Sequence, residues 1–345
     1  MPRHHANNKM AVPDQVDILL YGLGAKRSAE TNITTSIGSF YAFILSRNKN
    51  VRLTVVARSN YDAVKTSGLR ITSENHGEHK LTPYKVVKTP AEAGSTFDYV
   101  VCAHKAIDQA SVPKQLIPAV EEKKTTIVII QNGVGNEEPF REAFPGATIL
   151  SCVTWVGANQ PQPGIIKHAK SEDMQIGLFQ NPSLEESLEK ERLDIFATLL
   201  TNGNTVFQVV PDIQIRRWEK VVWNAAWNSL TTLTMLDTHN WLNSSPEATP
   251  ITRRLMHEVI DVANKCNVPL EYSLADRLIS KILGMHTIGS SMQVDAKNGR
   301  PMEVEIILGY PVKKGRELGV SIPTLETIYT ILTGMNQRFL GLASL

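Results

Sequence analysis

The sequence predicts an N-terminal α/β domain built on a parallel sheet, followed by a C-terminal all-helical domain. Four short apolar segments alternate with helix-length stretches and end in glycine, asparagine or other polar residues, as is typical of a parallel sheet covered on both faces. The segments are 16–21, 51–57, 99–103 and 126–130. Beyond residue 209 the apolar residues recur at helical spacing instead. Pro211 and Asp212 supply a chain breaker and an N-cap candidate, so we place the domain boundary there.

The second half is expected to consist of helices throughout. Apolar periodicity predicts four helices and a last one that opens near Pro323. The four are 213–235, 251–265, 273–284 and 303–319. A length of 345 residues fits two domains at roughly 100 to 200 residues each. The expected division is a flexible N-terminal tail over 1–15, the α/β domain over 16–210 and the helical domain over 211–345.

Composition favours a globular protein that acts on small molecules. The chain is 42% hydrophobic and carries a formal net charge of +2, which is no basic excess for nucleic acid or an anionic membrane. No run of roughly eighteen apolar residues predicts a membrane span. The polar N-terminal tail lacks the apolar region of a secretory signal, so we expect a cytoplasmic protein.

The three cysteines show no metal-binding spacing. Cys102, Cys152 and Cys266 are far apart in the sequence, and the first two lie in strand-like segments. We expect buried thiols in a reducing compartment and no metal site.

A phosphate-binding turn is predicted where the first apolar segment ends. Gly22 and Gly24 form a Gly-x-Gly pair that is followed by Ala25. In Rossmann-type domains, a strand, such a turn and a helix N-terminus hold the pyrophosphate of a dinucleotide, because glycines admit the backbone closely and the helix offers free N–H groups.

The third glycine of that fingerprint is displaced along the chain. Its expected position holds Arg27, and Gly38 takes the third place only if residues 26–36 are excised. These residues are therefore an apparent insertion. The insertion either forms a polar loop, with Ser36 capping a displaced helix, or reflects a wrongly assigned exon boundary.

The end of the second apolar segment favours NADPH over NADH. Arg58 stands there beside Ser59 and Asn60, where a ribose 2′-phosphate needs a cation and a free 2′-hydroxyl needs a carboxylate. A solvated loop arginine has the same appearance.

Two further strand ends carry candidates for the nicotinamide side of the site. Lys105 follows the third apolar segment and Asn132 follows the fourth. Ligands of open α/β sheets lie beyond the carboxyl ends of the strands. Asn132 with Gly133 is also an ordinary turn signal, so both interpretations stay open at this point.

Lys220, Asn224 and Asn228 form the chain's strongest candidate for catalysis. They fall four residues apart, so on a helix they make one stripe of an ammonium and two carboxamides in a segment dense in Trp, Val and Ala. A proton donor with two orienting amides suits reduction of a carbonyl, where negative charge grows on oxygen. An ordinary solvated helix face shows the same spacing.

In combination, these motifs resemble the ketopantoate (2-dehydropantoate) 2-reductase family over roughly residues 16–340. The resemblance rests on the interrupted glycine turn, the arginine after the second strand, the Gln-Asn-Gly turn, the lysine and asparagine stripe and a C-terminal group. That group is Ser290-Ser291-Met292 followed by Asp295, Gly299-Arg300 and Glu303.

The resemblance implies reduction of 2-dehydropantoate to (R)-pantoate with NADPH, in a cleft between a Rossmann-type domain and a helical domain, on the route to pantothenate and coenzyme A. It maps the catalytic lysine, which donates the proton, onto Lys220 and the cleft glutamate onto Glu303. The implied substrate-binding residues are Asn224, Asn228 and Ser291. The implied cofactor contacts are Gly22, Gly24, Ala25, Gly38, Arg58, Lys105 and Asn132.

Glu303 has a neighbour that could take its role. A carboxylate at a helix start is favourable in any protein, and Glu305 stands two residues later. By its position in the resembled motif we prefer Glu303 and expect Glu305 to lie on another face.

Departures from the resembled pattern keep two alternatives open. Ile288 stands where the bacterial pattern often has asparagine, and the segment up to Asp237 lacks an expected amide. The chain could therefore reduce another 2-keto acid or a carbonyl of specialised metabolism. The insertion suggests an NADP-binding paralogue with weak or no catalysis.

Trp223 and Trp227 suit either a homodimer face or the core.

Overall fold

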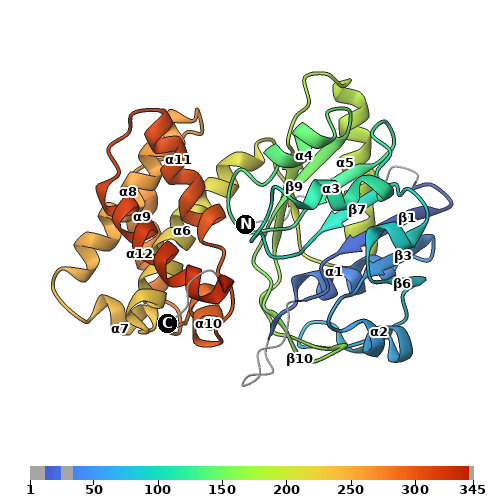
Figure 1. Ribbon diagram of the computed structural model, residues 1–345, viewed down its shortest axis with the longest axis horizontal. Coiled ribbons are helices and arrows are strands. Elements are labelled where there is room, and N and C mark those ends of the chain that lie inside the picture. Colours follow the sequence, from blue (N-terminus) through green and yellow to red (C-terminus); the bar gives the residue numbers. More distant parts are fainter. Residues whose placement is uncertain (1–11, 25–33, 342–345) are drawn as a thin grey trace.

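The structure, a computed structural model, describes residues 12–24 and 34–341 and divides into an α/β half and a helical half that lie side by side (Figure 1). The predicted fold class is confirmed. Ala25 and residues 26–33 of the apparent insertion lie outside the described residues.

An eight-stranded sheet forms the centre of the α/β half. Its order is β13-β12-β9-β8-β7-β1-β3-β6, and the six strands from β9 to β6 run parallel. β12 pairs antiparallel with β9 and β13 pairs parallel with β12, so this end of the sheet departs from the parallel order that the sequence predicts. The strands are β1 Val16–Tyr21, β3 Val51–Val56, β6 Lys85–Val87, β7 Tyr99–Cys102, β8 Thr126–Ile129, β9 Thr148–Thr154, β12 Met174–Leu178 and β13 Gln208–Val209.

Both faces of this sheet are covered, as the uniformly apolar strands predict. Along β1, Ile18 and Leu20 pack into the cluster that holds Phe40, whereas Leu19 packs into the opposite cluster with Phe140. The helices and 3-10 turns of this half are α1 Ile37–Ser46, α2 Tyr61–Ser67, η1 Pro90–Ala93, α3 Val112–Leu116, η2 Ile117–Ala119, α4 Glu138–Ala143 and α5 Glu186–Asn202.

A second, five-stranded sheet was not predicted. Its order is β2-β10-β11-β4-β5. The strands are β2 Thr34–Thr35, β10 Ala158–Gln162, β11 Ile165–His168, β4 Leu69–Ser73 and β5 Gly77–Leu81. β2 lies within the apparent insertion and pairs antiparallel with β10, so the end of the insertion adds an edge strand to this sheet.

The helical half opens at α6, whose first turn is capped as the sequence predicts: Asp212 accepts a hydrogen bond from the backbone N–H of Gln214 at 2.9 Å. The predicted helices are confirmed, except that 303–319 contains a π-helical turn before α11. The short helices α7 and α10 were missed. The elements are α6 Ile213–Thr234, α7 Thr238–Leu242, α8 Ala248–Lys265, α9 Ser273–Leu283, α10 Ser291–Lys297, η3 Glu305–Gly309, α11 Tyr310–Glu317 and α12 Pro323–Leu340.

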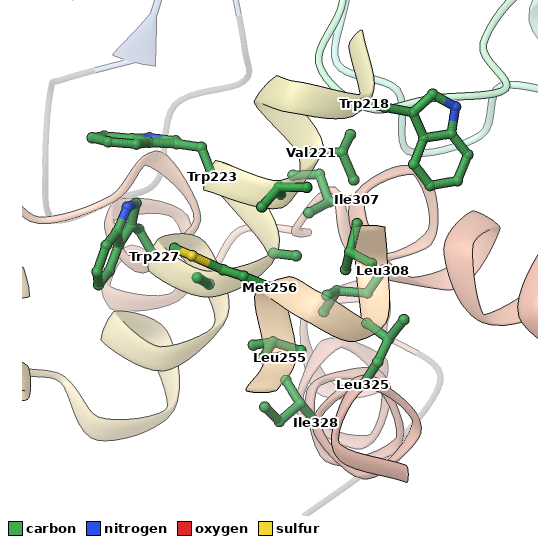
Figure 2. Close-up of a cluster of buried hydrophobic side chains, with 14 of the residues drawn as sticks. Trp218, Val221, Trp223, Trp227, Leu255, Met256, Ile307, Leu308, Leu325 and Ile328 are labelled. Atoms are coloured by element: carbon green, nitrogen blue, oxygen red, sulfur yellow. The ribbon is translucent and has the colours of Figure 1, made fainter. Parts of the chain in front are cut away.

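α6 forms part of the core of the helical half and also packs against β9 and β12 of the main sheet. Figure 2 shows its tryptophans within that core. Trp223 and Trp227 are buried, so of the two interpretations left open, the core is the one confirmed.

The cysteines are free thiols. Cys102 and Cys152 are buried as expected, and Cys266 is half-buried. Within residues 12–24 and 34–341 there is no group of three or more His, Cys, Asp and Glu side chains that could hold a metal ion. A search of the same residues finds no helix with the length and hydropathy of a membrane span.

Candidate active site

The glycine turn is packed too closely to accept a side chain, as is typical of dinucleotide-binding turns. Gly22 has a φ of +112°, and a Cβ there would lie 2.3 Å from the backbone N of His104. A Cβ on Gly38 would lie 1.9 Å from the carbonyl oxygen of Gly22. Only glycine fits at either position. Gly38, in the first turn of α1, therefore packs on the turn where the third glycine of the fingerprint would, despite its displacement in the sequence.

One carbonyl fixes the shape of this turn. The Leu23 oxygen accepts hydrogen bonds from the Ser36 hydroxyl at 3.0 Å, the Ser39 hydroxyl at 2.7 Å and the Gln160 amide at 3.1 Å. Ser36 occupies the N-cap position of α1, but its side chain makes no capping hydrogen bond. Ser36 is therefore the N-cap residue that the loop alternative expected, but its side chain does not make the cap. The hydroxyl is directed instead to the glycine turn.

A cationic pocket of about 400 Å³ lies beyond the carboxyl ends of β1 and β3. Arg58 lines it, with its guanidinium 6.0 Å from the ring centroid of Tyr21. Lys88 and Lys114 line the same pocket, and its lining contains no carboxylate. The donor set fits a phosphomonoester. Neither lysine belongs to a sequence motif; Lys88 directly follows the short strand β6, which the sequence does not predict.

Lys220 lies at the junction of the two halves. Its ammonium donates a hydrogen bond to the carbonyl of Thr154, at the end of β9, and lies 5.0 Å from the ring centroid of Trp155. Burial and the Arg217 guanidinium lower the pKa of Lys220 to about 8, and the Glu303 carboxylate acts in the opposite direction. The amine thus remains mostly protonated at neutral pH but gives up its proton more readily than a surface lysine.

Glu303 joins the helical half to two strand-end loops of the α/β half. It is buried, and its Oε1 accepts from the backbone N–H of Ala106 at 3.0 Å. Its Oε2 accepts from the Asn132 amide at 3.1 Å. Glu305 is exposed and accepts from the Tyr329 hydroxyl instead, which confirms that it faces elsewhere.

An ion pair also crosses the same junction. Lys105, the other candidate strand-end residue, pairs with Asp295 of α10. The second oxygen of Asp295 lies 3.0 Å from Nε of Arg300. Lys105 and Asn132, at neighbouring strand ends, are therefore both held by carboxylates of the helical half.

The two asparagines of the stripe are buried on α6, one and two turns after Lys220. The side-chain nitrogen of Asn224 has no hydrogen-bond partner among the described residues. A buried donor without a partner is costly to leave unsatisfied, so this amide fits a site that receives a ligand acceptor.

Ser291 stands apart from the buried candidates. It is exposed at the start of α10, and its neighbour Ser290 is the buried N-cap, which accepts from the backbone N–H of Gln293 at 3.0 Å. Ser290 also accepts from the Thr231 hydroxyl at 2.8 Å, which ties α10 to α6. The structure thus brings Lys220, Glu303, Asn132 and Lys105 to the junction of the halves, with Ser291 at an exposed position.

Two models of the ketopantoate reductase PanE/ApbA family match this chain. The first matches residues 34–181, beginning at β2 within the apparent insertion, and the C-terminal model matches residues 212–336. A 2-dehydropantoate 2-reductase of Nostoc sp. is 25% identical over 306 residues, which cover 88% of this chain and 94% of that protein.

Solved structures agree with these matches. The crystal structure of 2-dehydropantoate 2-reductase from Methylococcus capsulatus is 31% identical, has a TM-score of 0.80 and covers 94% of this chain and 98% of that one. A ternary structure of D-mandelate dehydrogenase with NADH and anilino(oxo)acetate shares the fold, with a TM-score of 0.79 at 19% identity over 94% of this chain and 99% of that one. The chain therefore belongs to the ketopantoate reductase PanE/ApbA family of NAD(P)H-dependent oxidoreductases.

Proposed function

We propose that this protein reduces 2-dehydropantoate to (R)-pantoate with NADPH, as a step towards pantothenate and coenzyme A. The observation that carries the proposal is the position of Lys220: its half-buried ammonium donates to the Thr154 carbonyl at the junction of the α/β half and the helical half, and the charge of the Glu303 carboxylate raises its pKa. The matched relatives that are named as 2-dehydropantoate 2-reductases support the choice of substrate.

The glycine turn and three nearby side chains suit the binding of a dinucleotide. The close packing of Gly22 and Gly38 brings the glycine turn against the first turn of α1, and we assign the pyrophosphate to this turn and to the helix N-terminus. Arg58 is assigned to the 2′-phosphate, and Lys105 and Asn132 to the nicotinamide side. The bound cofactor supplies the hydride for the keto carbon.

Lys220 is the proton donor in this proposal. As the keto carbon is reduced, negative charge grows on the carbonyl oxygen, and the ammonium both neutralises that charge and transfers a proton to it. Glu303 holds the lysine charged through its carboxylate and accepts a hydrogen bond from a substrate hydroxyl. Asn224 and Asn228 orient the keto acid through their amides, and Ser291 is assigned to the substrate from its place in the family's motif.

The test is an NADPH oxidation assay with 2-dehydropantoate and a panel of other 2-keto acids. We expect saturable turnover with a kcat/KM of roughly 10⁴ M⁻¹ s⁻¹ or more for 2-dehydropantoate and pantoate as the product. A kcat/KM more than about a hundredfold higher for another keto acid would assign the reaction to a different substrate. Absence of NADPH oxidation with every keto acid would favour the non-catalytic paralogue.

Replacing Arg58 with alanine should raise the KM for NADPH and leave the KM for NADH nearly unchanged. Loss of a charge-assisted hydrogen bond to a phosphate costs roughly 1.5–3 kcal/mol, or about 10- to 100-fold in affinity. The measurement is the ratio of the two KM values in Arg58→Ala and in a control, Arg70→Ala, which removes an exposed arginine on β4. Equal effects on NADPH and NADH would show that Arg58 does not contact the 2′-phosphate.

A further inference from the structure

We propose that Lys281 is the counter-ion of the substrate carboxylate and that Trp155 is the surface on which the substrate's side chain packs, which selects 2-keto acids with branched or aromatic side chains. The inference rests on the proposed function, because it concerns the substrate of the same site. It assigns roles to two residues, from α9 and from the end of β9, that the motifs in the sequence did not single out.

The ammonium groups of Lys220 and Lys281 lie on the same indole. Nζ of Lys220 is 5.0 Å and Nζ of Lys281 is 5.1 Å from the ring centroid of Trp155. The two nitrogens are therefore no farther apart than the sum of these distances. In this proposal a small keto acid lies between the two ammonium groups and accepts a hydrogen bond of about 2.8 Å from each, one at its carbonyl and one at its carboxylate.

Trp155 is held firmly between the two halves. Its Nε1 donates to Gln175 at 3.3 Å, and its ring meets Trp223 edge to face with centroids 5.9 Å apart. Trp223 meets Trp227 in the same way at 5.9 Å. Figure 2 shows Trp223 and Trp227 together at one edge of the helical core. Trp155 is itself half-buried, so it joins this aromatic row while part of its surface stays accessible.

Lys281 also lies 5.3 Å from the centroid of Trp223, so its ammonium is placed over two indoles at once. In the part of the chain that the structure describes, no carboxylate forms an ion pair with it. Cation–π contacts of this kind hold an ammonium in place and leave its N–H donors free for an anion. Lys281 is exposed, in the last turn of α9, where a cation also favours the helix dipole.

The substrate requires such a group. A 2-keto acid is a carboxylate at neutral pH, and Lys220 is assigned to the carbonyl oxygen. Ser291, which the family's motif assigns to the substrate, is neutral. Lys281 carries a full positive charge and contacts the same indole as Lys220, and it balances the carboxylate better than a hydroxyl does. The accessible part of the Trp155 ring then offers apolar area to the substrate's side chain.

Lys281→Met should raise the KM for 2-keto acids about tenfold or more, with kcat and its pH dependence unchanged and the Kd for NADPH unchanged. Lys281→Arg should restore most of the affinity. The matched control is Lys265→Met, which removes an exposed lysine from the last turn of α8 and so reproduces any effect on a helix dipole. Equal KM values in wild type, Lys281→Met and the control would overturn the assignment.

A second measurement does not depend on turnover. An N-substituted oxamate, an unreactive mimic of a 2-keto acid, should quench the fluorescence of the tryptophan row, and Lys281→Met should weaken its binding about tenfold whereas Lys265→Met should not. The methyl ester of the same compound should bind wild type and Lys281→Met equally. Lys281-dependent binding without NADPH oxidation would contradict the proposed function but not this inference. Oxidation with no Lys281 dependence would contradict the inference alone.

The side-chain preference is tested by a ratio that cancels general losses of activity. In wild type, kcat/KM should be at least about a hundredfold higher for phenylglyoxylate or a branched 2-keto acid than for pyruvate, because a few buried carbon atoms contribute that much. Trp155→Leu should lower this ratio at least about tenfold. A ratio that is near one in wild type, or unchanged in Trp155→Leu, would exclude Trp155 as the packing surface.

Discussion

Replacing Lys220 with alanine is expected to lower kcat for keto-acid reduction by roughly 10²- to 10⁴-fold, the usual contribution of a positioned general acid. The loss should appear in kcat, because the ammonium acts on charge that develops only as the carbonyl is reduced. The Kd for NADPH, measured by fluorescence titration, should stay within a few-fold of wild type. Lys265→Ala, which removes an exposed lysine in α8, is the control and should keep full activity. Undiminished kcat in Lys220→Ala would overturn the mechanism.

The pH dependence of the reaction provides an independent test of the same residue. Lys220 donates only when protonated, and its pKa is lowered to about 8, so the rate of reduction should fall as the pH rises through that value. Glu303 raises the pKa of Lys220. Glu303→Gln should therefore move the descending limb to lower pH, in addition to any loss of substrate affinity. A limb that stays in place in Glu303→Gln would show that this carboxylate does not hold the lysine charged.

Local patterns in the sequence predicted the parts of the site that depend on neighbours along the chain. The stripe of Lys220, Asn224 and Asn228 follows from helical periodicity alone. Gly38 could be matched to the glycine turn because the strand, the turn and the helix of this motif follow one another along the chain. Residues inserted between them can therefore be recognised in the sequence. In the structure Gly38 packs against Gly22, as that alignment requires.

The rest depended on contacts between distant segments. Lys281 and Trp155 meet although more than a hundred residues separate them, and neither carries a local signal, since exposed lysines at helix ends and apolar residues at strand ends are common. The second sheet was missed for the same reason. Its strands are short, and β4 pairs in parallel with β11, far along the chain. Periodicity reports which face of an element is apolar, but not which distant element covers it.

Arg216 and Arg217 illustrate this limit most sharply, because two identical side chains adjacent in sequence have opposite surroundings. Arg216 pairs with Glu219 at 2.8 Å on the surface of α6. Arg217 is 1% exposed and lies 2.8 Å from Glu137, which is equally buried. Its guanidinium also donates to the carbonyls of Gln131 and Gly133, each at 2.9 Å. These hydrogen bonds connect α6, which carries Lys220, to the strand-end loop that contains Asn132.

Arg217→Met should destabilise the protein by roughly 3–5 kcal/mol, because it leaves the Glu137 carboxylate buried without its partner and two carbonyls without a donor. The midpoint of thermal unfolding should fall by roughly 4–7 °C, because the unfolding entropy of a chain of 345 residues is large. Arg216→Met, which breaks only a surface pair, should cost less than about 1 kcal/mol. The double variant Arg217→Met with Glu137→Met should be more stable than Arg217→Met alone, since it removes the uncompensated charge.

The same substitution carries a signature that simple loss of packing would not produce. The Arg217 charge lowers the pKa of Lys220, so in Arg217→Met, assayed well below its unfolding temperature, the descending limb of the pH profile should move to higher pH. This is the opposite direction to the shift expected in Glu303→Gln. Opposite shifts in the two variants would identify the titrating group as Lys220, whose pKa the two charges move in opposite directions. Shifts in one common direction would mean that the limb belongs to another group.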